Sequence, residues 1–265
     1  MDREPAVAGR FYTDDPATLA GQLDRFLAAG GEKLQARGIV APHAGYVYSG
    51  AIAGAVYARI EVPARVIVLG PNHTGIGAAA ALWPASGAWR TPLGDVPVDA
   101  DLTAALAASS LVTPDTRAHR LEHALEVQVP FLQRARPGVS IAALCLTHLA
   151  YEDCVEIGRT VAAAASAKGA LVVASSDMSH YIPAAVADRK DHRAIERILA
   201  LDPQGLYDVV HAEDISMCGI IPTTVMLVAA RLMGATRAEL VRYGHSGEVS
   251  GDDDSVVGYA GIAVV

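Results

Sequence analysis

Histidines recur at one kind of position in this sequence, directly after short apolar runs that predict strands. The histidines at these positions are His43, His73, His148, His180 and His245. Asp177 stands in the same segment as His180. Because ligands in open α/β sheets bind beyond the carboxyl ends of the strands, we expect these segments to converge on one site. Neutral imidazole binds zinc, copper and iron, so the pattern favours a metal centre.

Cys218 is the cysteine best placed to join such a centre. It stands in SMCGIIP, just before a predicted helix whose N–H groups and dipole favour a thiolate. A metal ligand must be deprotonated, so this position favours metal binding. The alternative is an inert buried cysteine, which is our interpretation of Cys145 in a strand and Cys154 in a helix.

The segment RLEHALEVQVPFL carries further polar side chains on a helix predicted over residues 121–135. In a helix, His119 and His123 would share a face, and so would Glu122 and Glu126, because each pair is four residues apart. No HExxH pattern accompanies the histidine pair. We therefore interpret His123 as a candidate acid or base and His119 as a surface residue.

The elements that position these residues alternate along the chain. Strands are predicted at 38–41, 65–69, 78–83, 140–146, 171–174, 239–243 and 256–265, and helices at 49–58, 121–135, 151–168, 184–201, 205–210 and 220–233. Further helices are predicted after Pro16 and after a cap at Asp99. Strands separated by helices of this length predict an α/β fold with a mostly parallel sheet covered on both faces. We expect a single three-layer α/β/α domain over residues 1–265.

Composition excludes several classes of protein. The formal net charge of −8 has the wrong sign for a nucleic-acid-binding protein. No apolar run reaches the roughly 18 residues of a membrane span, and three cysteines without a CxxC pair indicate a reducing compartment, so we expect a cytoplasmic protein. A phosphate loop, a GxGxxG motif and a GxSxG motif are all absent, which disfavours nucleotide-driven chemistry and serine hydrolysis.

Six motifs in order resemble the Memo family, also called AmmeMemoRadiSam system protein B. They are AGRFY, APHAGYVYSG, LGPNHTG, EHALEVQVPFL, SSDMSHY and MCG, and the resemblance runs from about Arg3 to the C-terminal strand. It implies a fold similar to class III extradiol dioxygenases of the LigB type, an α/β/α sandwich with a metal pocket at the strand ends. The family's second name also implies a pathway shared with a radical S-adenosylmethionine protein.

The resemblance also implies a ligand set. It assigns one metal ion, iron or copper, to His43, His73 and Cys218, and we keep zinc as an alternative. Asp177, His123 and His180 match further polar positions of the pocket. We expect His123 or His180 to move a proton during catalysis and Asp177 to orient it.

One departure limits the expected chemistry. Ring-opening iron oxygenases use two histidines and a carboxylate, whereas the third ligand here would be a thiolate. We therefore expect a metal-dependent redox enzyme of unknown substrate rather than a ring-cleaving enzyme. The alternative, implied by animal Memo proteins that recognise phosphotyrosine-containing peptides, is a non-catalytic adaptor that binds a peptide or small ligand in the same pocket.

Overall fold

One sheet of nine strands organises the computed structural model, which describes residues 1–28 and 31–265. The strand order is β10-β11-β1-β8-β2-β7-β3-β6, with β9 paired to β11. The strands are β1 (Gly38–Ala41), β2 (Arg65–Pro71), β3 (Ala80–Leu82), β6 (Thr113–Pro114), β7 (Ser140–Leu146), β8 (Leu171–Ser175), β9 (His180–Ile182), β10 (Ala238–His245) and β11 (Val256–Val264). A separate hairpin joins β4 (Ala88–Thr91) to β5 (Gly94–Pro97).

The centre of the sheet is parallel. Strands β1, β8, β2 and β7 pair in parallel, and all residues of β1 and β8 are buried. Burial on both faces explains their short, continuous apolar sequences. Antiparallel strands extend the sheet, with β11 and β10 beyond β1, and β3 beyond β7. The predicted α/β fold is confirmed, with antiparallel pairing added towards the edges.

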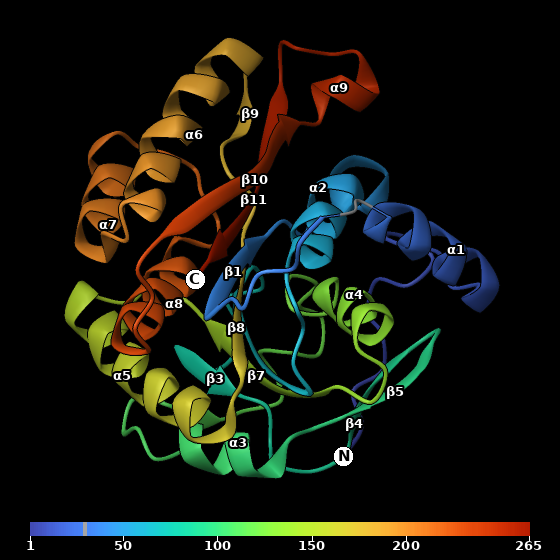
Figure 1. The fold of residues 1–265 in the computed structure, drawn as a ribbon, viewed down its shortest axis with the longest axis vertical. Helices are drawn as coiled ribbons and strands as arrows, with labels where there is room; N and C mark the ends of the chain where they lie inside the picture. The colour runs from blue at the N-terminus through green and yellow to red at the C-terminus, as the bar shows by residue number, and fades with distance from the viewer. Residues whose placement is uncertain (29–30) are drawn as a thin grey trace.

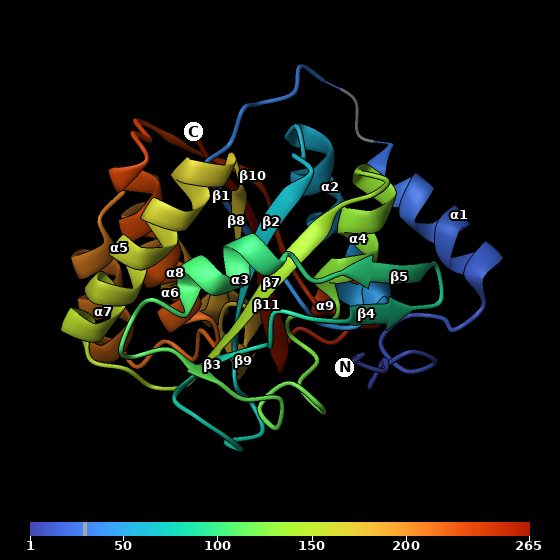
Figure 2. The ribbon, with the colours of Figure 1, turned by 90° about the horizontal axis from the view of Figure 1, so that it is seen from below.

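Helices cover both faces of the sheet, as Figures 1 and 2 show. One face carries α1 (Pro16–Leu27), α2 (Tyr46–Arg59) and α4 (Gln128–Ala135). The other carries α3 (Ala100–Leu106), α5 (Tyr151–Lys168) and α8 (Ile220–Leu232), with α6 (Ala184–Leu199) and α7 (Pro203–Ala212) beside them. The short α9 (Gly247–Ser250) lies between β10 and β11. Among the described residues no helix is long and apolar enough to cross a bilayer.

Side-chain caps begin two helices where the sequence predicts them. Asp15 accepts the N–H of Thr18 at the start of α1, and Asp99 accepts the N–H of Leu102 at the start of α3. Each carboxylate satisfies a backbone donor that the first helical turn leaves free.

The helix predicted over residues 121–135 is wrong in its first half, because α4 begins only at Gln128. The Glu122 carboxylate accepts the N–H groups of His73 and Ala124. Glu126 accepts backbone N–H groups from the N-terminal segment. These bonds hold residues 121–127 in turns, since such side-chain bonds compete with helix formation. The predicted pairing of side chains four residues apart on one helical face therefore does not occur.

Candidate metal centre

Three side chains from separate elements meet at the carboxyl end of the parallel strands. His43 follows β1, His73 follows β2, and Cys218 precedes α8. One ligand atom from each lies within 4.8 Å of the other two, and the Cys218 Sγ is 3.2 Å from Nε2 of His43. Ligand atoms around a tetrahedral zinc-sized ion lie about 3.5 Å apart. The three donors are therefore close enough together that one ion could bind all of them.

Hydrogen bonds set the tautomer of His43. Its Nδ1 lies 2.9 Å from Oγ of Ser175. The Ser175 hydroxyl donates its only proton to the carbonyl of Ala124 at 2.6 Å and also accepts an N–H from Gln128. The proton of the His43–Ser175 bond must therefore reside on Nδ1, which leaves the lone pair of Nε2 facing Cys218.

A carboxylate orients His73 in the same sense. Nδ1 of His73 lies 2.8 Å from Oε1 of Glu122, and Oε2 accepts the backbone N–H of His73 at 2.6 Å. Because a carboxylate only accepts, Nδ1 carries the proton and Nε2 is free to bind a metal. Histidines that bind a metal through one ring nitrogen commonly donate the N–H of the other to a carboxylate.

Burial also affects the ionisation of the ligands. The pKa of His43 is lowered well below its ordinary value by burial and then by the nearby His123 and His73. His43 is therefore neutral at neutral pH, as a metal ligand must be.

Cys218 departs from the prediction that its helix position favours the thiolate. Burial, followed by the charge of Asp177, raises the pKa of its thiol well above the ordinary value. The N–H of Gly219, at the start of α8, donates to Ser176 rather than to the sulfur. The Asp177 N–H, at 3.3 Å, is the backbone donor to Sγ. In the metal-free protein the group is a thiol, and a bound cation would be required to hold it as a thiolate.

Asp177 lies beside His43. Its Oδ1 accepts the backbone N–H of His43 at 2.8 Å, and its Oδ2 is 4.0 Å from Nε2 of the same residue. Burial raises the pKa of Asp177 to about 6. The side chain thus fixes the loop that carries a ligand and also adds an ionisable group next to it.

The two remaining predicted histidines have different surroundings. The ring of His123 stacks on His73 with centroids 4.5 Å apart, and burial lowers its pKa to about 4. The ring of Phe11 also packs against His123, with centroids 4.7 Å apart. His180 is partly buried, and its Nδ1 lies 2.8 Å from the carbonyl of Ser216, so Nδ1 is protonated and Nε2 is free.

Not every strand-end histidine joins the cluster. His148 lines a cavity beside the three proposed ligands. His245 is the last residue of β10, and its Nδ1 lies 3.9 Å from the carboxylate of Asp253. The interpretation of His119 as a surface residue is wrong, because its side chain is fully buried. It packs between Trp83 and Trp89, and its Nε2 contacts the carbonyl of Ala81 at 2.9 Å.

The sequence assigned no role to Glu122, Ser175 or Gln128, which hold the two histidines in place. The only local signal was the proximity of Glu122 to His123 and of Ser175 to Asp177 in the chain. The contacts themselves join segments far apart in the sequence, so spacing could not reveal them.

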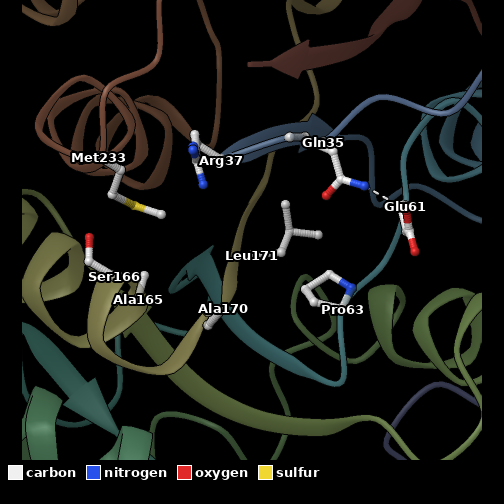
Figure 3. A pocket seen from close by; sticks show the side chains of 11 residues that line it. Gln35, Arg37, Glu61, Pro63, Ala165, Ser166, Ala170, Leu171 and Met233 are labelled. Atoms are coloured by element: carbon white, nitrogen blue, oxygen red, sulfur yellow. Dashed lines mark hydrogen bonds between the residues drawn. The ribbon is translucent and has the colours of Figure 1, made fainter.

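A second hollow lies at the opposite, amino end of the central strands (Figure 3). Gln35, Arg37, Glu61 and Met233 contribute to its lining, and the amide of Gln35 donates to Glu61 at 2.6 Å. No histidine or cysteine is among the described residues that line it. The chemistry-bearing side chains are thus concentrated at the carboxyl end of the strands.

Comparison with known proteins identifies the family. The family model described as Memo-like protein matches residues 3–263. The chain belongs to the Memo family. It is 42% identical to a MEMO1 family protein of Aquifex aeolicus over 264 residues, covering 98% of each chain. It is 43% identical to a MEMO1 family protein of Methanosarcina barkeri over 268 residues, covering 99% of each. The resemblance seen in the six motifs is confirmed.

A solved structure supports the fold of this Memo-family chain. The uncharacterised protein JW3007 from Escherichia coli K12 superposes with a TM-score of 0.50 at 16% identity. The match covers 75% of this chain and 85% of the other. At this identity the similarity concerns the fold alone.

Proposed function

We propose that this Memo-family protein is a metal-dependent redox enzyme whose single ion binds His43, His73 and Cys218. The arrangement of the donors supports this function: two histidines with free Nε2 atoms lie within 4.8 Å of a cysteine sulfur. Two imidazoles and a thiolate suit copper, iron and zinc. We propose iron or copper, with zinc as the alternative, because either supplies one-electron chemistry when bound.

The surrounding side chains would handle protons. His123 is neutral at neutral pH and stacks on a proposed ligand, so it can accept a proton from a substrate held beside the ion. His180 keeps its Nε2 free because its Nδ1 is bonded to a backbone carbonyl. Asp177 holds the backbone of His43 and so orients the first ligand. Ring opening is not part of the proposal, because the third donor is sulfur rather than a carboxylate.

Metal analysis tests the proposal. The protein would be purified without oxygen and its iron, copper and zinc measured beside His73→Ala and Cys218→Ala. The half-exposed His192 on α6, outside the candidate metal centre, provides a control variant, His192→Ala. We expect about one ion per chain in the wild type and the control, a sharp loss in the other two variants, and oxygen uptake only by protein that holds iron or copper.

Two results would count against the redox function. A wild type that contains neither iron nor copper, and takes up neither on reconstitution, contradicts the redox function. A ligand or protein partner whose binding survives His43→Ala would instead indicate the adaptor function.

A further inference from the structure

A cavity of about 660 Å³ opens beside the candidate metal centre. His73 and Cys218 line it, so two of the three proposed ligands form part of its wall. The rest comes from residues 71–75 at the end of β2 and beyond it, from residues 146–148 at the end of β7, and from the segment that runs from the end of α7 to the start of α8. Its size is that of cavities that hold small molecules.

Most of the wall away from the ligands is apolar. Its buried apolar side chains are Leu146, Val210, Ile215, Met217, Ile220 and Ile221. They belong to the edge of the large core cluster on the α5–α8 face of the sheet. A rigid apolar wall favours a ligand that has an apolar body of similar size.

The charged side chain in the described wall of the cavity is acidic. Asp214 is its acidic residue, and neither lysine nor arginine is found among the described residues that line the cavity. Lys190 donates to the carbonyls of Glu213 and Asp214 at 2.8 and 2.9 Å, which fixes the turn where Asp214 has a φ of 50°. Within the described chain the Asp214 carboxylate takes part in no ion pair. Asp214 is exposed to solvent and is the acidic side chain of the described wall.

A histidine adds an acceptor to the same wall. Nδ1 of His211 lies 2.7 Å from the carbonyl of Tyr207, so Nδ1 is protonated and Nε2 is left as an acceptor. Acceptors on Asp214 and His211 suit a ligand that donates hydrogen bonds. Apart from the proposed ion, a carboxylate or phosphate would meet no cationic side chain among the described residues that line the cavity.

We infer that this cavity binds the body of the substrate, a small and mainly apolar molecule in which an amine beside Asp214 is favoured over a carboxylate. The inference rests on the proposed function only in treating the bound molecule as a substrate of the metal centre. The molecule would extend from His73 and Cys218 along the apolar wall towards Asp214.

Three probes of equal size and different charge test the inference on the full chain after a chelator has removed metal, so that benzoate cannot bind the proposed ion: benzylamine, benzyl alcohol and benzoate. Titration followed by ligand-observed NMR should rank their affinities in that order, with the amine about threefold tighter than the alcohol and benzoate weakest. Asp214→Asn should abolish the advantage of the amine, because asparagine tolerates the same positive φ but carries no charge. Asp208→Asn, an exposed change on α7 outside the cavity, should leave it intact.

A second variant tests the location. Thr147 is partly buried and lines the cavity, so Thr147→Phe should fill space and weaken all three probes at least tenfold. Benzoate binding as tightly as benzylamine, or an order that Asp214→Asn leaves unchanged, overturns the inference. So does undiminished binding to a folded Thr147→Phe protein.

The proposed metal site and the inferred ligand cavity can be tested independently of each other. His43 does not line the cavity, so the probe series is repeated with His43→Ala. If the wild type takes up no metal but the order of probes holds, the redox function is wrong and the cavity inference stands. If the metal binds and the order fails, the cavity inference alone is wrong.

Discussion

Nδ1 of His73 lies 2.8 Å from Oε1 of Glu122, a carboxylate that has no exposed surface. Both oxygens of Glu122 are used, because Oε2 accepts the backbone N–H of His73. Glu122→Gln keeps the shape but leaves one acceptor oxygen for these donors. We expect metal affinity to fall by about 10- to 100-fold, measured by competition with a chelator.

Glu126→Gln provides the matched contrast in the same segment. Glu126 binds Arg3 at 2.7 Å and the hydroxyl of Tyr12 at 2.7 Å, and both members of the ion pair are buried. We expect this variant to lose about 3 kcal/mol in the free energy of unfolding and to keep its metal affinity. If both variants lost metal affinity equally, Glu122 would affect metal binding only by stabilising the fold.

Metal binding should release a proton from Cys218. Burial raises the pKa of its thiol, so the group is protonated before an ion binds and must ionise to become a ligand. Apparent affinity should therefore rise about tenfold per pH unit near neutral pH. Calorimetry in two buffers of different ionisation enthalpy measures the proton count, and Cys218→Ser should lower it by about one. A proton count that this substitution does not change would contradict the expected ionisation.

Asp191 should make stability depend on pH. Its carboxylate accepts the N–H of Ser179 and the hydroxyl of Tyr243, and burial raises its pKa above the value of 3.8. A raised folded-state pKa means that the protonated form favours folding. The contribution of Asp191 to stability is therefore complete below the pKa that this carboxyl has in the unfolded chain. It is lost as the pH rises through the pKa that the carboxyl has in the folded protein. Urea unfolding from about pH 4 to about pH 7 should show this loss in the wild type relative to Asp191→Asn. The exposed change Asp208→Asn should follow the wild type.

Two glycines should respond in opposite directions to alanine. A Cβ on Gly54 of α2 would lie 2.6 Å from the backbone oxygen of Phe26, whereas a Cβ on Gly21 of α1 would meet nothing within 4 Å. We expect Gly54→Ala to destabilise the protein by about 1–3 kcal/mol, because backbone cannot easily move aside. Gly21→Ala should stabilise it by about 0.5–1 kcal/mol through helix propensity. Thermal unfolding of both variants measures the difference, and a stabilised Gly54→Ala would contradict the packing of α1 on α2.

The sequence predicted the elements whose signal is local. Apolar runs ending before His43 and His73 identified two parallel strands, because a strand buried on both faces must be apolar throughout. The helix that follows Cys218 was equally clear from its apolar composition. These features positioned the residues that the structure brings together.

The sequence did not reveal interactions between distant segments. The carboxylates of Glu122 and Glu126 replace helical hydrogen bonds with bonds to other parts of the chain, so a helical pattern of residues gave the wrong local structure. His119 was placed on the surface because a lone histidine shows no sign of the two tryptophans that enclose it. The tautomers of His43 and His73 likewise depend on partners that spacing cannot identify.

The position of β11 has a consequence for biosynthesis. Val256–Val264 pairs with β1 on one side and β10 on the other, so residues made late complete the sheet around a strand made early. While the polypeptide emerges from the ribosome, Gly38–Ala41 lacks this neighbour and can pair only with β8. Contacts across such a long stretch form slowly. The side of the sheet next to β1 would then be completed only after the C-terminal strand has been synthesised.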